Sequence, residues 1–285
     1  MQCGEGAFGA MTKYSLKKGL LAISSASFGL WVSMTAPLIA GPFSSPDFVD
    51  MEDEEALGAH LSEVGAQGRL IFEKDNAAAI ATDGLRNHLK GIDQRVRGWV
   101  SERQGDGKWR VLFFGDKDTL LHWVDTQDGA ITPNGIKSFG SGVPLNNRQR
   151  AMVKARTAAA NKKFTACTDS YNTVVVDAPE GDFYVYLLAA TGDPSLVTIG
   201  GHYRRLIDGD TFKVKKTRQY SKGCLILKKE ENSAGLISSN AYVSYPEEVH
   251  VFVSLLHDMP LYIITSKNGI FWKVADGEVS LVRGN

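Results

Sequence analysis

The sequence predicts an α+β protein in which N-terminal and central helices pack on a largely antiparallel β-sheet, with β-hairpins at the C-terminus. Three observations support this prediction. Residues 51–91 are rich in Ala, Glu and Leu, whereas most of the chain after residue 97 alternates short apolar runs with Gly and Asp turns. A second helical segment, rich in Ala and basic residues, lies over 145–163. Asx-Gly pairs at 268–269 and 276–277 separate the last apolar runs, as hairpin turns do.

The first 40 residues are interpreted as a signal peptide for export. Basic residues precede an uncharged stretch over 20–40, which ends in small residues near Ala40 and Gly41. Residues 1–10 are then upstream of the true start. Since the uncharged stretch is long enough to span a bilayer, an uncleaved membrane anchor is the alternative. We therefore expect a periplasmic or secreted protein that contacts the membrane only if residues 20–40 are retained.

The rest of the chain is predicted to be a linker followed by one α+β domain. Residues 41–50 are rich in Pro and Ser and form the expected linker, and the domain covers 51–285. Its first segment, 51–91, is predicted to contain two helices that are separated near Gly65 and Gly68.

Strands are predicted for most of the remaining sequence. Three strands joined by glycine turns are expected over 97–129. A helix then begins after Pro144, with Asn146 or Asn147 as its N-cap. Antiparallel strands continue from there to the C-terminus, and the apolar run VHVFVSLLH at 249–257 is interpreted as one of them.

The cysteines indicate a disulfide. Cys3 lies upstream of the predicted signal, so the exported chain retains only Cys167 and Cys224. In an oxidising compartment this pair is expected to form a disulfide, which contributes about 4 kcal/mol in the chain-entropy model. A nucleophilic cysteine is the alternative. No Cys/His spacing typical of zinc is present, and we expect neither a metal nor a cofactor.

The histidines do not form a recognisable metal or catalytic pattern. His250 and His257 are an odd number of residues apart, so on a strand their side chains would point to opposite faces. His202 and Arg204 are predicted to share the wetter face of another strand. Gly200 and Gly201 precede them and would allow a ligand or a second backbone to approach closely.

The formal net charge is zero, yet the charges are segregated along the sequence. The segments 145–163 and 211–229 contain basic residues and no acid, whereas acids cluster over 50–55. Solvated faces are one explanation of the basic segments. The other is an anion-binding surface, and its candidate residues are His202, Arg204, Lys213, Lys215, Lys216 and Arg218.

These features favour an exported, non-enzymatic binding or interaction protein of the bacterial envelope. An anionic envelope lipid or glycan, or another envelope protein, is the expected partner. Nucleic acid is disfavoured because Tyr220 is the one aromatic residue counted as interleaved with the basic ones, which is little for base stacking. The alternative is a metal-independent hydrolase whose site is assembled from distant residues. Neither a G-x-S-x-G elbow nor a selected carboxylate pair is present, so the sequence identifies no catalytic residue.

Overall fold

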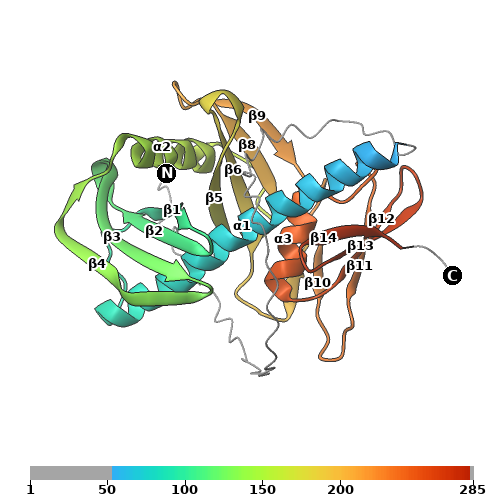
Figure 1. Ribbon diagram of the computed structural model, residues 1–285, viewed down its shortest axis with the longest axis horizontal. Helices are drawn as coiled ribbons and strands as arrows, with labels where there is room; N and C mark the ends of the chain where they lie inside the picture. The colour runs from blue at the N-terminus through green and yellow to red at the C-terminus, as the bar shows by residue number, and fades with distance from the viewer. Residues whose placement is uncertain (1–52, 283–285) are drawn as a thin grey trace, which may run out of the picture.

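The protein is described here by a computed structural model that covers residues 53–282 (Figure 1). Three α-helices and fourteen β-strands in this range form the predicted α+β fold. The predicted signal peptide and linker lie outside the described residues. Among the helices of 53–282, none combines the length and the apolarity of a membrane span.

The first helix, α1 (Glu54–Leu89), is continuous, so the prediction of two helices was wrong. It runs diagonally across the whole molecule (Figure 1). Gly65 and Gly68 do not end a helix but allow close packing. A Cβ at Gly68 would lie 2.4 Å from the Cβ of Val251, and one at Gly65 would lie 2.8 Å from the carbonyl oxygen of Gly277.

The first sheet packs against the C-terminal part of α1. Its strands are antiparallel in the order β1-β2-β3-β4, which confirms the three strands predicted over 97–129. The fourth strand was missed because it is a mostly exposed edge strand with two breaks in register, so it shows no alternation. The four strands are β1 (Gly98–Gly105), β2 (Lys108–Phe114), β3 (Thr119–Gln127) and β4 (Ala130–Pro144).

The second helix, α2 (Asn147–Asn161), begins where the sequence predicted. The Asn146 side chain accepts a hydrogen bond from the backbone of Gln149, whose side chain in turn accepts one from the backbone N–H of Asn146. The apolar side of α2 shares a core with strands of the first sheet and of the middle sheet.

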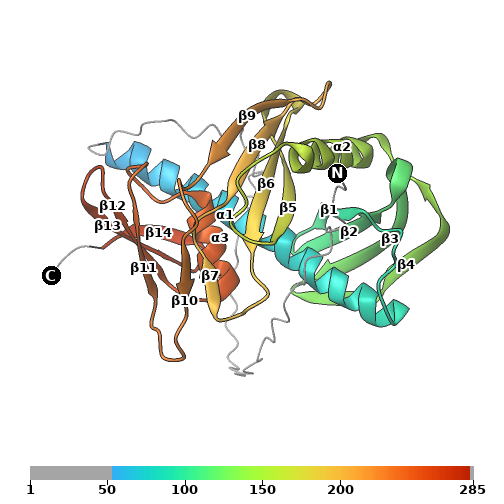
Figure 2. The same ribbon diagram turned by 180° about the vertical axis from the view of Figure 1, so that it is seen from behind.

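The middle sheet is covered on both faces. Its antiparallel order is β5-β6-β8-β9, and α2 covers one face while α1 and α3 lie on the other (Figure 2). A separate antiparallel pair joins two short strands, β7 (Leu196–Thr198) and β10 (Ile226–Lys228). The strands of the middle sheet are β5 (Ser170–Asp177), β6 (Phe183–Ala190), β8 (Tyr203–Ile207) and β9 (Val214–Gln219).

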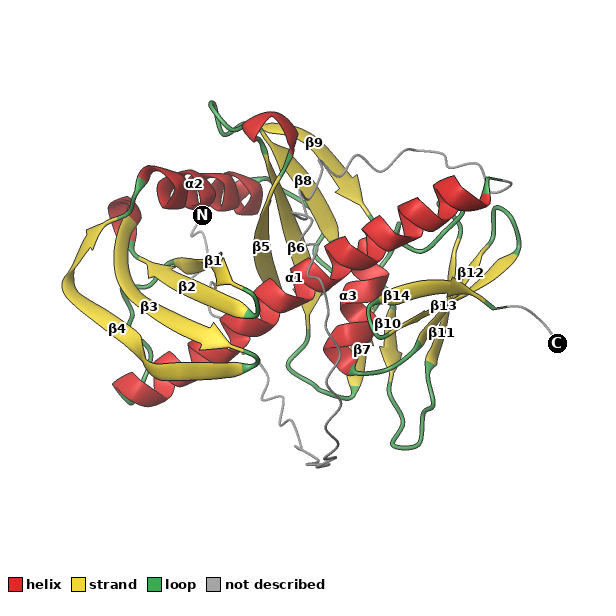
Figure 3. Ribbon diagram, in the orientation of Figure 1, coloured by secondary structure: helices red, strands yellow, loops and turns green. Residues whose placement is uncertain are grey.

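The C-terminal sheet has the order β11-β12-β13-β14 (Figure 3). Its two hairpins turn at 268–269 and 276–277, as predicted. Its first pair, β11 with β12, is parallel, and a parallel pair requires a crossover connection. The strands are β11 (Leu236–Asn240), β12 (Leu261–Thr265), β13 (Ile270–Ala275) and β14 (Glu278–Leu281).

The crossover contains α3 (Glu248–His257), so the strand predicted over 249–257 is a helix. Every residue from Glu248 to Ser254 is buried, and a helix that is buried all round shows no polar face in its sequence. His250 and His257 are therefore about two turns apart and lie on the same side of α3, not on opposite faces of a strand.

Candidate functional site

His202 is buried, whereas the sequence predicted that it would face solvent. Only 1 % of the residue is accessible. Its Nδ1 accepts a hydrogen bond from the backbone N–H of Ala189 at 3.1 Å, and its Nε2 lies 3.0 Å from the carbonyl oxygen of Thr198. Burial lowers the pKa of His202 to about 4. The prediction assumed one wet face, but the middle sheet is covered on both sides, so His202 is a structural residue of the core.

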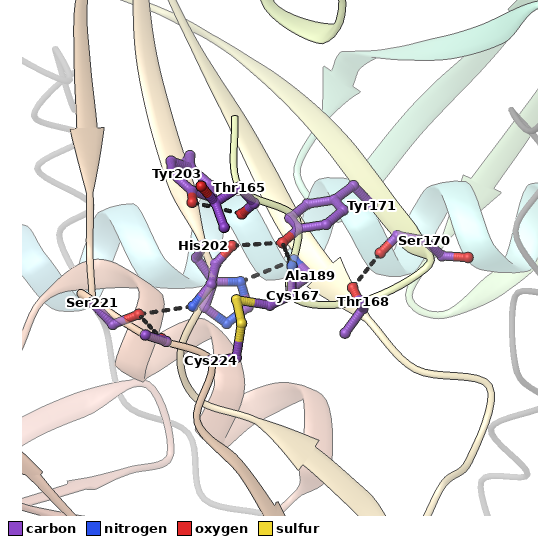
Figure 4. Close-up of a disulfide and its surroundings, with 12 residues drawn as sticks. Thr165, Cys167, Thr168, Ser170, Tyr171, Ala189, His202, Tyr203, Ser221 and Cys224 are labelled. Atoms are coloured by element: carbon purple, nitrogen blue, oxygen red, sulfur yellow. Dashed lines mark hydrogen bonds between the residues drawn. A yellow bond between two sulfur atoms is a disulfide. The ribbon is translucent and has the colours of Figure 1, made fainter. Parts of the chain in front are cut away.

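The glycines before His202 accommodate another part of the chain. Gly201 adopts a φ of +86°, and a Cβ there would lie 2.6 Å from the Cβ of Cys167. Cys167 forms the predicted disulfide with Cys224, at an S–S distance of 2.06 Å (Figure 4). The Tyr171 hydroxyl donates to the carbonyl of Gly201 at 3.0 Å and accepts from the backbone of Cys167 at 2.9 Å. The close approach therefore serves the disulfide.

Arg204 was also predicted to face solvent, but it is buried and lies in a charge network with Arg218. The Arg204 guanidinium is 2.8 Å from the Glu248 carboxylate, and Arg218 pairs with Glu247. Two phenol groups donate to the same oxygen of Glu248, namely those of Tyr186 and Tyr220. We call these six residues the Glu248 network: Tyr186, Arg204, Arg218, Tyr220, Glu247 and Glu248.

The Glu248 network balances its charges internally, since it contains two guanidinium groups and two carboxyl groups. Burial raises the pKa of Glu247 to about 7. Burial also raises the pKa values of Tyr186 and Tyr220, so both phenols keep the protons that they donate. Arg204 and Arg218 therefore already form ion pairs with acidic residues of the protein itself.

The three lysines of the predicted anion-binding surface differ in whether they form ion pairs. Lys215 lies 2.8 Å from the Asp182 carboxylate and 3.1 Å from that of Asp208, whereas Lys213 and Lys216 are exposed. Of the six predicted residues, only Lys213 and Lys216 are therefore exposed and without an ion pair within 53–282. A ligand-binding role for this group stays a prediction.

The two basic segments lie close to each other where β9 begins. The Lys154 ammonium of α2 lies 5.3 Å from the ring centre of Phe212, which precedes β9. Elsewhere on α2, Arg148 pairs with Asp177 at 2.6 Å. The half-buried Arg156 lies 5.5 Å from the ring centre of Phe114, and desolvation lowers its pKa to about 10. The basic residues of α2 thus serve several different local contacts.

A groove of about 880 Å³ lies between the first sheet and the middle sheet. Its walls are the second half of β1 and the end of β5 with the turn that follows it. Helices α1 and α2 complete the lining. The lining includes Lys74, Glu102, Arg103, Trp109 and Asp177.

Both strands that wall the groove are outer strands of their sheets. The Lys74 side chain donates to the carbonyl of Ser101 at 2.8 Å, so this carbonyl points away from β2 and towards α1. The direction of the backbone N–H and C=O groups repeats every two residues along a strand. Those of Arg103 therefore point to the same side of β1 as the Ser101 carbonyl. The backbone N–H and C=O groups of Arg103 are thus directed towards the groove and not towards β2.

Lys74 is the unusual residue of the groove. It is 8 % exposed, and its ammonium lies 5.0 Å from the ring centre of Trp109. No acidic side chain of residues 53–282 forms an ion pair with it. Burial lowers the pKa of Lys74 to about 8. Near pH 7 it is a largely protonated ammonium with spare hydrogen-bond donors.

Most other charged groups of the groove have partners. Arg148 pairs with Asp177, Arg103 lies 3.7 Å from the Asp106 carboxylate, and Glu102 accepts from Gln149 at 3.1 Å. Glu180, which also lines the groove, is an exposed acid. Around Lys74, acids and arginines act in opposite directions on its pKa. Lys74 is thus the buried cation of a groove that contains charges of both signs.

The burial of Lys74 can be recognised from the sequence. Ile71 and Ala78 are seven residues apart in the helical segment 51–91, so they share one apolar face of the helix. Lys74 is three residues after the first and four before the second, so it falls on this same face. A lysine within an apolar helical stripe is a candidate for a buried charge.

No set of three His, Cys, Asp or Glu side chains within 53–282 is arranged to hold a metal ion. His250 instead uses its Nδ1 to accept from the backbone of Glu247 at 2.9 Å. Burial lowers the pKa values of His250 and His257 to about 4.

No family model matches the chain, and no curated protein is significantly similar to it. Its function is therefore inferred from geometry and chemistry.

Proposed function

We propose that this chain is an exported binding protein that holds an extended, acidic polypeptide segment in the groove beside β1. Lys74 is the observation that carries this proposal, because it is a buried ammonium without an ion-pair partner among the described residues. An unpaired buried charge is unfavourable, and a carboxylate placed beside it offsets the loss of hydration. A ligand with an acidic group is the partner that the groove suits best.

The open strand edges favour a polypeptide over a glycan or a lipid headgroup. An extended peptide can add to an exposed sheet edge through its backbone, while pockets for alternate side chains provide specificity. The outer edges of β1 and β5 both border the groove. The groove volume falls within the usual range of about 300–1,000 Å³ for ligand sites, which suits a short peptide segment.

The disulfide supports the cellular setting of the proposal. Disulfides persist mainly in oxidising compartments, and the Cys167–Cys224 bridge fits a periplasmic or secreted protein. There, another envelope protein can supply the acidic segment.

Binding of two hexapeptide pools to the full chain tests the proposal. The pools differ only at one fixed position, which is Glu in one and Gln in the other, and depletion of each peptide is followed by mass spectrometry. We expect selective retention of Glu peptides, and weaker retention at high salt because the ligand charge is partly exposed to screening. Lys74→Met should abolish this preference.

Lys213→Met is the matched control, because the same change is made at an exposed lysine of the predicted surface. It should bind as the wild type does. Equal retention of the Glu and Gln pools would contradict the proposal. So would retention of polygalacturonate or anionic vesicles that depends on Lys213 and not on Lys74, since this would move the site to the surface around β9.

A further inference from the structure

A second group of polar side chains lies on the face of the first sheet that packs against α1. His122 of β3 and Ser138 of β4 are direct cross-strand partners, so their side chains lie on one face. His122 Nδ1 lies 2.8 Å from Ser138 Oγ. His122 Nε2 lies 2.8 Å from Oδ2 of Asp93, in the segment that follows α1.

The carboxylate of Asp93 determines which nitrogen of His122 carries the proton. Hydrogen bonds from the Arg95 side chain and from His122 hold the pKa of Asp93 well below its usual range. An ionised carboxylate only accepts, so Nε2 donates to Asp93. In the neutral imidazole Nδ1 is then the acceptor, and it receives the Ser138 hydroxyl proton. This is the protonation pattern that a general base for a serine nucleophile requires.

Only the serine end of this chain of hydrogen bonds is open to solvent. The side chain of His122 is 3 % exposed and that of Asp93 is 13 % exposed, whereas Ser138 is an exposed residue of an edge strand. A hydroxyl in such a position can meet a substrate while its base remains fixed.

The strand geometry next to Ser138 is irregular. Along β3, the partner in β4 changes from Val143 at Leu120 to Ser138 at His122, so residues 139–142 form a bulge outside the ladder. The Arg95 side chain, which also holds Asp93, donates to the carbonyl of Gly140 in this bulge. Bulges of this kind re-aim side chains and are frequent beside active sites. They also leave backbone N–H groups that can donate to an oxyanion.

The site lies beside β2, where Phe113 is the direct cross-strand partner of His122. A recess adjoins Asp93, but its volume of about 20 Å³ is room for about one water and not for an acyl group. A substrate therefore reaches Ser138 from the solvent side of β4.

We infer that Ser138, His122 and Asp93 form a site that hydrolyses carboxylic esters. Ser138 Oγ attacks the ester carbonyl carbon, and its proton passes to His122 Nδ1. The tetrahedral intermediate expels the alcohol, which takes that proton. Water then attacks the acyl-serine, gives one proton to Nδ1, and releases the carboxylic acid as the proton returns to Ser138. The net reaction consumes one ester and one water and yields one acid and one alcohol.

This site is independent of the groove. Along β2, Phe113 and Trp109 are four residues apart, or roughly 13 Å at the usual rise of a strand. Loss of peptide binding and loss of esterase activity are therefore separable outcomes.

The test combines a fluorophosphonate probe with hydrolysis of p-nitrophenyl butyrate by the full chain. We expect one adduct, on the peptide that contains Ser138, and a fall in kcat/KM of about 100-fold or more in Ser138→Ala. Ser239→Ala is the matched control, since Ser239 is an exposed serine of β11, an outer strand of the C-terminal sheet, and it should leave both readouts unchanged.

Asp93→Asn tests the positioning role of the acid. The amide no longer imposes the tautomer with hydrogen on Nε2, so labelling of the intact Ser138 should slow by about 100-fold or more. A wild-type chain that keeps its cooperative melting transition but takes up no probe contradicts the assignment. Labelling or ester hydrolysis that persists in Ser138→Ala contradicts it equally.

Discussion

Two buried cations of this molecule have opposite electrostatic surroundings. Arg204 of the middle sheet lies 2.8 Å from the Glu248 carboxylate, within a network that balances its charges. Lys74 of α1 has a backbone carbonyl and the face of Trp109 as neighbours but forms no ion pair with an acid of residues 53–282. A buried charge persists only where a favourable interaction offsets its lost hydration. The fold supplies that interaction to Arg204, and we propose that a ligand supplies it to Lys74.

The largest change in stability is expected when the ion pair between Arg204 and Glu248 is broken. Glu248→Gln leaves Arg204 buried without its carboxylate, and we expect the free energy of unfolding to fall by about 3–5 kcal/mol. The measurement is urea denaturation followed by circular dichroism. Glu230→Gln is the control because Glu230 pairs with Lys228 at an exposed site, and it should change stability by about 0.5 kcal/mol or less. A Glu248→Gln variant as stable as the control would show that the network is not structural.

Asp75, the neighbour of Lys74 on α1, provides a buried acid for the comparison. Burial raises its pKa to about 7, and a hydrogen bond with Asn172 opposes the shift. Between about pH 4 and pH 7 the folded state holds a proton at Asp75 that the unfolded state has released. Its contribution to stability is therefore greatest at low pH and is lost as pH rises through this window, by at most about 1.4 kcal/mol per pH unit. Asp75→Asn should remove this slope in urea titrations from pH 4 to 7. An unchanged slope would assign it to other groups.

Lys74 should show the opposite slope. Its pKa is lowered from 10.5 to about 8, so between these values the unfolded state binds the proton and the folded state does not. Stability at this site therefore rises with pH across that window, again by at most about 1.4 kcal/mol per pH unit. Lys74→Met should remove the rise and should be neutral or stabilising by about 1 kcal/mol near pH 7. A clear loss of stability in Lys74→Met would indicate that the lysine is structural, as Arg204 is.

Local features of the fold were predictable from the sequence. The Asn146 cap, the turns at Asn268–Gly269 and Asp276–Gly277, and the pairing of Cys167 with Cys224 each depend on residues whose chemistry admits few alternatives. Helix α3 was missed because an apolar run that is buried on all sides has no period to detect.

The candidate sites were less predictable because they depend on tertiary contacts. Whether His202, just before β8, faces water is decided by the second layer on the middle sheet, which no pattern in the neighbouring sequence reveals. Ser138 meets His122 only through the register of β3 with β4, and that register includes a bulge. Of these residues, only Lys74 is recognisable from a sequence pattern, because it is a charged residue on an apolar helical face.

The most direct test of the proposed function is the pKa of Lys74 itself, measured from the ¹³Cε chemical shift during a pH titration. In the free chain we expect the pKa of Lys74 near 8, and saturation with an acidic peptide selected from the Glu pool should raise it towards 10.5 or beyond. A Lys74 pKa of 10.5 in the free chain, or one that does not move when the peptide is bound, would contradict the account.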